Sequence, residues 1–157
     1  MKRLLVAAIV VLAVVSGSLF AQGNPLVGIW KLNVEKSKYN PGPAPKSLTR
    51  TVEPNGDGAK YTFEGVAADG TAIAYGFAVG FDGKDNPVTG SMPNGANSIA
   101  AKRTSDDSFE ATLKKDGKVV GTSVVKVSKD GKVTTVESKG TNTAGVKTHD
   151  VQVYDKQ

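Results

Sequence analysis

Seven Asn-Gly or Asp-Gly pairs recur along this chain of 157 residues, and they constrain its fold more than any other feature. Such pairs favour tight hairpin turns, because both residue types tolerate positive φ angles. The spacing between successive breaks is mostly 10 to 14 residues, which is typical of short antiparallel strands that follow one another in sequence. The pairs begin at Asn55, Asp57, Asp69, Asp82, Asn94, Asp116 and Asp130.

The segments between these turns have the pattern of strands. Tyr61 and Phe63 alternate with polar residues, which indicates one buried and one solvated face. No segment has a helical pattern or the crossover length that parallel strands require. We therefore predict an all-β fold, an antiparallel up-and-down meander of about eight to ten strands. Because an open meander would expose two edges to pairing with other chains, we expect it to close into a barrel.

The expected strands lie within residues 26–34, 47–53, 60–64, 71–81, 86–90, 96–103, 109–113, 119–127, 133–137 and 146–154. Residues 71–81 are unusual, since large apolar side chains alternate with Ala and Gly along the whole segment. We expect this strand to pack on both faces, or its small face to lie beneath a loop.

The N-terminus has the layout of a secretory signal. Lys2 and Arg3 precede an apolar run from Leu4 to Val15, and small residues follow up to Ala21. The run is shorter than the roughly 20 residues that a membrane span needs. We predict a signal peptide over residues 1–21, cleaved within the region from Ser18 to Ala21, and one domain over residues 22–157. The mature protein is then expected in the periplasm or outside the cell, without stable membrane insertion.

Composition excludes several kinds of chemistry. The chain has no cysteine and one histidine, which excludes disulfides, cysteine nucleophiles and multi-histidine metal sites in one chain. Its 20 basic and 15 acidic side chains are interspersed, so the net charge of +5 does not predict a nucleic-acid interface. Residues 55–58 are read as a hairpin turn, because Glu64 comes too early for a calcium loop. We expect no enzymatic activity, no metal and no cofactor, and the oligomeric state stays open.

One segment interrupts the hairpin rhythm. Residues 35–46 contain three prolines at alternate positions, Pro41, Pro43 and Pro45, which favour an extended and semi-rigid path. A connection of this length is often a functional lid. Two interpretations stay open: a strap across one end of the barrel, or a lid that controls access of a ligand.

A family resemblance rests on the first expected strand. Gly28-Ile29-Trp30 is similar to the Gly-x-Trp signature of lipocalins and fatty-acid-binding proteins, the calycin superfamily. Further stretches resemble a group of exported bacterial lipocalin-like proteins whose activity is not known. They are residues 30–33, 42–47, 82–85, 87–90, 128–132 and 139–142. The resemblance implies a calycin-like barrel in which Trp30 closes one end and Gly28 allows close passage of the chain.

The chain departs from the family pattern at two points. No Arg or long helix follows the last strand, where lipocalins usually place an Arg across the Trp, and residues 35–46 cannot form the helical cap of fatty-acid-binding proteins. We expect Arg103, or Lys147 from the last strand, to lie over Trp30 instead.

The resemblance and the aromatic residues together suggest a function. We predict a protein that binds a small hydrophobic molecule inside the barrel. The expected contacts are Tyr61, Phe63, Tyr75 and Phe77, together with His149, which shares a strand face with Val151 and Val153. A buried structural role for His149 is the alternative. For the whole protein, the alternative is a ligand-free structural or interaction module of the cell envelope, and an enzyme of lipocalin type is a third possibility.

Overall fold

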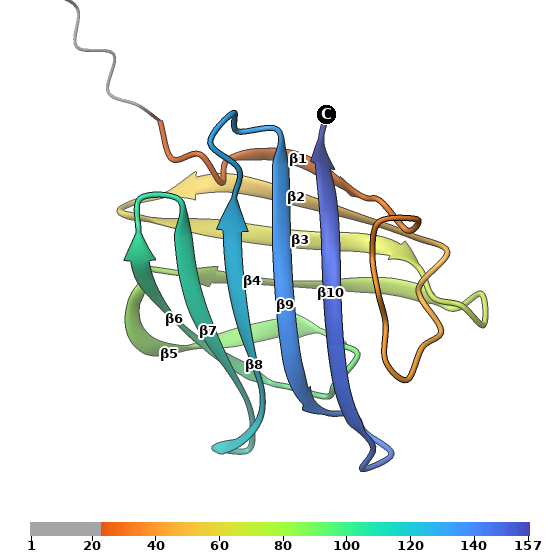
Figure 1. The fold of residues 1–157 in the computed structure, drawn as a ribbon. Coiled ribbons are helices and arrows are strands. Elements are labelled where there is room, and N and C mark those ends of the chain that lie inside the picture. Colours follow the sequence, from red (N-terminus) through yellow and green to blue (C-terminus); the bar gives the residue numbers. More distant parts are fainter. Residues whose placement is uncertain (1–22) are drawn as a thin grey trace, which may run out of the picture.

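The structure, a computed structural model, describes residues 23–157, which form ten antiparallel strands in chain order. The strands are β1 (Gly28–Leu32), β2 (Ser47–Asn55), β3 (Gly58–Val66), β4 (Ala72–Val79), β5 (Asp82–Gly90), β6 (Ser98–Ser105), β7 (Ser108–Lys115), β8 (Lys118–Val127), β9 (Val133–Thr141) and β10 (Lys147–Lys156). Each strand pairs with its neighbours in sequence, and β1 also pairs with β10, which closes the barrel (Figure 1). The predicted fold class is confirmed.

The signal peptide predicted for residues 1–21 lies outside the described residues. No helix within residues 23–157 is long and apolar enough to cross a membrane.

The turn residues act as the sequence predicted, with one shift. Asp116 and Gly117 connect β7 to β8 with φ angles of 51° and 78°, the pair of positive values that a tight hairpin turn of type I′ needs. Asp82-Gly83, in contrast, lies at the start of β5, and the chain reverses just before it, at Gly80-Phe81. Phe81 has a φ of 56° there, and its buried ring packs edge-on against Phe109, with 5.0 Å between the ring centroids.

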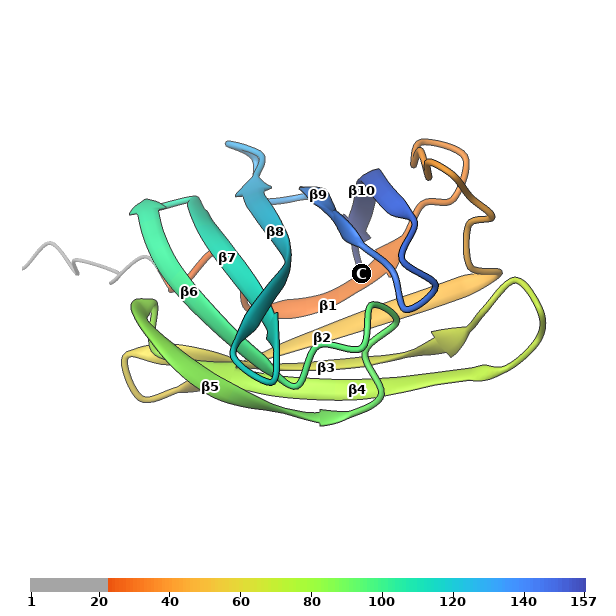
Figure 2. The ribbon, with the colours of Figure 1, turned by 90° about the horizontal axis from the view of Figure 1, so that it is seen from below.

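The barrel is flattened into two faces that cross each other. Strands β1 to β5 form one face and β6 to β10 form the other (Figure 2). Because side chains alternate along a strand, every second residue points into the space between the faces. The buried apolar residues from both faces form a single cluster.

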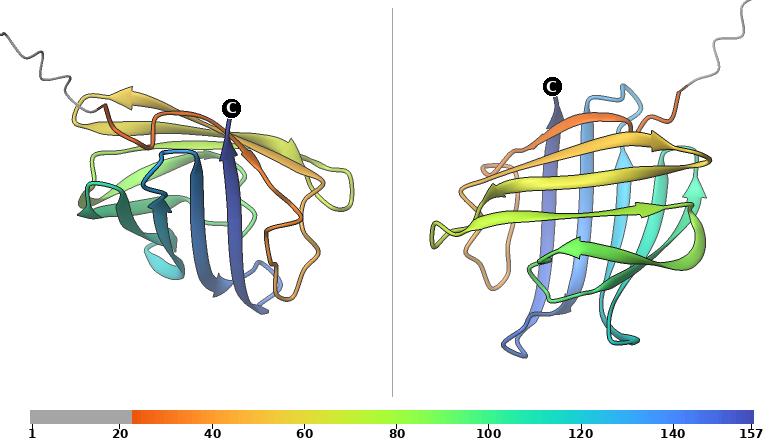
Figure 3. Two further views of the ribbon diagram at one scale, coloured as in Figure 1. Left: turned by 45° about the horizontal axis from the view of Figure 1, so that its top comes forward. Right: turned by 180° about the vertical axis from the view of Figure 1, so that it is seen from behind.

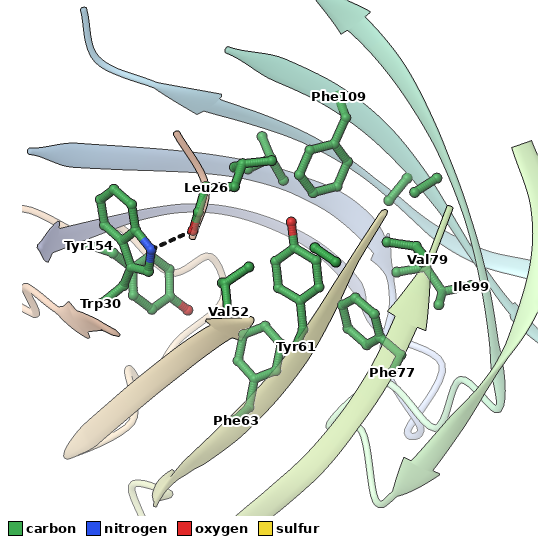
Figure 4. Packing of buried hydrophobic residues seen from close by; sticks show 14 of the residues in the cluster. Leu26, Trp30, Val52, Tyr61, Phe63, Phe77, Val79, Ile99, Phe109 and Tyr154 are labelled. Carbon is green, nitrogen blue, oxygen red and sulfur yellow. Dashed lines mark hydrogen bonds between the residues drawn. The ribbon is translucent and has the colours of Figure 1, made fainter. Parts of the chain in front are cut away.

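The two ends of the barrel differ. Leu26 and Trp30, both fully buried, pack at the end where β1 begins, and the Trp30 Nε1 donates a hydrogen bond to the Leu26 carbonyl oxygen at 2.8 Å (Figure 4). The opposite end carries the long connection between β1 and β2, residues 33–46, visible as the extended loop in Figure 3. We call the end at which β1 begins the closed end, and the end that carries the long connection the mouth.

Gly28 makes the close passage at the closed end feasible. Its φ is +138°, and a Cβ atom placed on it would lie 2.8 Å from the Lys156 Cε. A residue with a side chain here would be strained and would displace Lys156 from the Trp30 ring.

The expectation that β4 is covered on both faces is wrong. Ala72 and Ala74 are exposed, while Gly76 and Ala78 are half-buried. The small residues lie on the outer surface of the barrel, over which no loop passes in the described structure. Large and small residues alternate along β4 because its outer face carries small, solvated residues, whereas its inner face carries the large side chains that fill the barrel.

Two glycines of one turn provide a test of the packing between β3 and β4. A Cβ atom on Gly58 would clash with the Val79 carbonyl oxygen, whereas one on Gly56 would meet no atom within 4 Å and would only be strained by its φ of +56°. We therefore expect Gly58→Ala to lower the free energy of unfolding by about 3 kcal/mol or more, and Gly56→Ala by about 1 kcal/mol. Urea unfolding monitored by circular dichroism measures both. Equal losses in the two variants would contradict this account of the turn.

Candidate functional site

The inside of the barrel contains a cavity of about 180 Å³. One wall is aromatic and comes from β3, β4 and β7, and the opposite wall is polar and comes from β8, β9 and β10. The aromatic wall consists of Tyr61, Phe63, Tyr75, Phe77 and Phe109. The polar wall includes Ser123, Ser138, Thr148, Asp150 and Gln152.

The aromatic wall is a stacked array. Phe63 and Tyr75 stack at 4.5 Å between centroids, and Tyr61 and Phe77 stack at 5.0 Å. Phe63 and Phe77 are also in contact, at 5.8 Å (Figure 4). These four residues are cross-strand partners on β3 and β4, so the register of two adjacent strands creates the array. The structure places all four sequence-predicted aromatic residues on the cavity wall.

The polar wall is partly hydrogen-bonded within itself. The hydroxyls of Ser123 and Ser138 are 2.9 Å apart, and the Tyr154 hydroxyl donates to the Gln152 Oε1 at 2.7 Å. Burial raises the pKa of Tyr154 from its ordinary value of 10 to about 12. A wall of this kind offers fixed polar groups to a ligand whose remaining surface contacts aromatic rings.

Arg50 is the most unusual residue of the cavity. It is only 2% exposed, and its guanidinium carbon lies 5.4 Å from the centroid of Trp30 and 4.7 Å from that of Tyr154. Its position follows from the register of the barrel, in which Arg50 is the direct partner of Trp30 across β1 and β2. Burial lowers the pKa of Arg50. The Nε and Nη2 atoms are buried and have no hydrogen-bond partner.

The expectation that Arg103 or Lys147 lies over Trp30 is wrong. The Arg103 guanidinium lies 4.5 Å from the Phe81 centroid, and its Nη1 donates to the Asp106 carbonyl oxygen at 3.2 Å. Trp30 is instead flanked by Arg50 and by the Lys156 ammonium, 5.0 Å from its ring. Both cations are cross-strand partners of Trp30, whereas Arg103 lies on β6, on the other face of the barrel.

The expectation that His149 points inward is also wrong. Its side chain is 49% exposed, and Nε2 lies 2.9 Å from the Glu137 Oε1 on the outer surface. The inward residues of β10 are Thr148, Asp150, Gln152 and Tyr154. The sequence analysis assigned the wrong residues of β10 to the inner face, because Val151 and Val153 suggested an apolar inner face. The inner face of this strand borders a polar cavity instead, and the two valines are half-buried on the outer side.

A second cavity of about 480 Å³ lies at the mouth. It shares six lining residues with the inner cavity, so the two adjoin. The shared residues are Tyr75, Met92, Pro93, Thr148, Asp150 and Gln152. The rest of its wall is mainly apolar and includes Leu48, Ile73 and the prolines Pro41, Pro43 and Pro45.

The proline-rich segment is held in place beside the mouth by β10. The Lys38 amide donates to the Val151 carbonyl oxygen and the Val151 amide to that of Lys38, both at 2.8 Å, and the His149 amide donates to the Asn40 carbonyl oxygen. The segment therefore extends the edge of β1 along β10 and borders the outer cavity. That this segment controls access of a ligand to the cavity stays a prediction.

Asp150 lies where the two cavities meet. Its Oδ1 accepts a hydrogen bond from the Asn40 amide at 3.0 Å, which attaches the proline-rich segment to the cavity wall. Partial burial raises the pKa of Asp150 above its ordinary value of 3.8. The hydrogen bond from Asn40 and the charge of His149 lower this pKa, but the effect of burial is larger. Within residues 23–157, no group of three or more His, Asp or Glu side chains is arranged to hold a metal ion.

Sequence reasoning missed the polar members of the cavity. Arg50 was missed, and so were Asp150 and Gln152, which occur in a strand whose pattern gives no sign that a polar side chain faces inward. A signal exists for Arg50, because Leu48 and Val52 flank it at alternate positions and imply that it shares their buried face.

Comparison with known proteins shows the fold. Neither family models nor curated proteins match this chain. Among solved structures, the zebrafish ileal bile acid-binding protein complexed with cholic acid matches with a TM-score of 0.53 and 16% identity, over 85% of this chain and 99% of that chain. The redesigned β-barrel mFAP1 bound to DFHBI matches with a TM-score of 0.47 and 13% identity, over 84% of this chain and 95% of that chain. The first match confirms the calycin-like barrel predicted from the sequence.

The raised pKa of Asp150 gives a test of its environment. Ionisation of this carboxyl costs more free energy in the folded than in the unfolded protein, so its contribution to stability falls as pH rises above about 4. Asp150→Asn keeps an oxygen that can accept from Asn40 but has no charge. We expect the unfolding free energy of the variant, relative to the original protein, to increase between pH 4 and 7 in urea unfolding series.

Asp69→Asn is the matched control for this pH series. Hydrogen bonds from Thr71 lower the pKa of Asp69, so its ionised form is favoured in the folded state. The relative stability of that variant should decrease only below about pH 4, as pH rises towards the ordinary pKa of an Asp carboxyl, and should stay nearly constant between pH 4 and 7. If the relative stability of Asp150→Asn is also constant between pH 4 and 7, the assignment for Asp150 is wrong.

Proposed function

We propose that this protein binds one small, mainly apolar molecule inside its barrel and catalyses no reaction on it. The single observation that carries the proposal is the two-walled cavity, aromatic on β3 and β4 and polar on β8 to β10. Ligand sites are typically apolar clefts with a few fixed polar groups, and this interior has that composition.

The cavity volumes define how the ligand lies. The inner cavity, at about 180 Å³, is smaller than the roughly 300 to 1,000 Å³ of ordinary ligand sites, whereas the outer one, at about 480 Å³, falls within that range. Because the two share lining residues, the proposed ligand occupies both and extends from the aromatic array to the mouth. Its outer part then contacts the proline-rich segment.

One structural neighbour supports this proposal at the level of the fold. The zebrafish protein was solved as a complex with cholic acid, so a barrel with this fold can accommodate a small organic molecule. The likeness concerns the fold, and the ligand of the zebrafish protein is not assigned to this chain.

The small inner cavity is the observation that favours the second candidate function. A barrel filled by its own side chains would serve as a structural or interaction module of the cell envelope and would need no ligand. The two functions differ in one measurable respect, because only the first requires the interior to bind an apolar molecule.

Adjacent residues of β9 allow a matched test. Ser138 lines the inner cavity, whereas Glu137 lies on the outer surface beside His149. We expect Ser138→Leu to weaken binding of the neutral fluorescent probe Nile red at least tenfold, because the new side chain fills the cavity. Glu137→Leu should bind the probe as the original protein does. Fluorescence titration gives both dissociation constants, and urea unfolding shows that each variant is folded.

Two outcomes would contradict ligand binding. One is equal weakening by both variants, which would place the probe outside the cavity. The other is no saturable binding to the original protein together with an empty organic extract, by mass spectrometry, of protein purified from its native host. That second outcome would favour the structural or interaction module.

We also propose that the protein is exported. The basic start, the apolar run from Leu4 to Val15 and the small residues up to Ala21 support a cleaved signal. In a bacterial host we expect mature protein in the periplasm or medium, with a mass that corresponds to cleavage between Ser18 and Gln22. Val10→Asp should keep the precursor in the cytoplasm, because the charge interrupts the apolar run. If the original protein, without this substitution, stays full-length and uncleaved in the cytoplasm, export is contradicted.

A further inference from the structure

We propose that the ligand of this cavity carries an ammonium group, which binds Asp150 where the two cavities meet, while its apolar body packs against the aromatic array. The inference rests on the proposed small-molecule binding, and it adds the charge and the orientation of the ligand. It is carried by the side chains that β10 turns towards both cavities.

Asp150 has no cationic partner among the described residues. None of the five ion pairs within residues 23–157 involves it. Its Oδ1 accepts one hydrogen bond, from the Asn40 amide at 3.0 Å. A carboxylate can accept about four hydrogen bonds, so this one can accept more from a ligand. Because Asp150 is half-buried, its charge is partly desolvated, and a cation bound beside it would offset that cost.

The strand β10 presents further acceptors beside this carboxylate. Thr148, Asp150 and Gln152 occupy alternate positions of β10, and all three line both cavities. Ser138, the direct partner of Asp150 on β9, lines the inner cavity as well. Hydroxyl, amide and carboxylate oxygens all accept hydrogen bonds. An ammonium has three N–H donors and no acceptor, so it matches a row of acceptors that carries one negative charge.

The aromatic array lies within reach of the same junction. Tyr75 lines both cavities, and its ring stacks on Phe63 with 4.5 Å between the ring centroids. Aromatic ring faces attract cations and also pack against the apolar parts of a ligand. A molecule whose ammonium binds Asp150 can therefore pack its apolar body on Tyr75 and Phe63.

The two basic residues that line the inner cavity do not neutralise Asp150. The Lys139 ammonium pairs with Glu137 at 3.1 Å on the outer surface. The Arg50 guanidinium carbon lies 4.7 Å from the centroid of Tyr154. Tyr154 follows Asp150 by four residues on β10, which corresponds to about 13 Å along the strand. The negative charge at the junction is therefore separated from the positive charge of Arg50, and a cationic ligand group fits at Asp150.

2-Phenylethylamine and 2-phenylethanol form a matched pair of probes. They share the same phenylethyl body, but only the amine is positively charged at pH 7.5. We expect the mature protein, residues 22–157, to bind the amine more tightly than the alcohol by about tenfold or more, because a hydrogen bond to a charged group contributes about that much. Isothermal titration calorimetry measures both dissociation constants, and their ratio is the preference for the amine.

Two variants of Asp150 test the role of its charge. Asp150→Asn removes the charge and keeps an oxygen that can accept from the Asn40 amide, so the proline-rich segment stays attached. We expect this variant to lose the preference for the amine and to bind the alcohol as the original protein does. Asp150→Glu, which restores a carboxylate, should retain part of the preference. Urea unfolding shows that each variant is folded.

Asp69→Asn is the matched control for the loss of one negative charge near the mouth. Asp69 follows Ala68, which lines the outer cavity, but its own carboxylate accepts hydrogen bonds from Thr71. Among the described residues, Asp69 belongs to the wall of neither cavity. We expect this variant to keep the full preference for the amine, because attraction between separated exposed charges is screened by salt.

The outcomes separate this inference from the proposed function. Equal or weaker binding of the amine than of the alcohol, or an unchanged preference in Asp150→Asn, would overturn the ammonium site and leave small-molecule binding intact. An equal loss of preference in Asp69→Asn and Asp150→Asn would also overturn it, as would failure of the amine to bind while Nile red still binds. If the original protein binds none of the three probes, the proposed function itself fails.

Discussion

The barrel closes where β1 pairs with both β2 and β10, and Trp30, like its neighbour Lys31, has a partner on each of these two strands. Its cross-strand partners are Arg50 on one side and Lys156 on the other, and both cations lie over the indole ring. Because β1 is the shortest strand, this cluster strengthens a junction at which β1 and β10 form only three residue pairs. The hydrogen bond from Trp30 to Leu26 ties the preceding segment to the same end.

Closure at one end leaves the interior open at the other. The large buried side chains around Trp30 fill the end at which β1 begins, whereas the inner positions of β8 to β10 near the mouth carry small or polar residues such as Ser123 and Ser138. Small side chains on one wall opposite aromatic rings on the other leave unfilled space. The cavity therefore results from an unequal distribution of side-chain volume around one continuous sheet.

Arg50 connects closure with the proposed binding site. Arg50 is one of the residues that line the cavity, its guanidinium packs against Trp30 and Tyr154, and two of its nitrogens are buried without a hydrogen-bond partner. A buried cation without an acceptor lowers stability, and such local costs are characteristic of functional positions.

Much of the fold, and the aromatic half of the site, could be predicted from the sequence. Turn pairs such as Asp116-Gly117 set the strand boundaries through their local backbone preferences, and the alternation around Tyr61 and Phe63 identified an inward face. The phase of β10 could not be read, because Val151 and Val153 mark the buried face only if the interior is apolar. For His149 that condition does not hold, since the inner side of β10 borders a polar cavity.

The amino-acid sequence by itself determined an antiparallel meander and the four aromatic residues that β3 and β4 contribute to the cavity wall, because both depend on turn chemistry and on a period of two. Only the tertiary structure decided which cation packs on Trp30, and that it is Arg50 rather than Arg103. That choice depends on the register between β1 and β2, across a connection of 14 residues whose path is set by contacts with β10. Register over such a distance is fixed by packing of the whole barrel, and no local pattern encodes it.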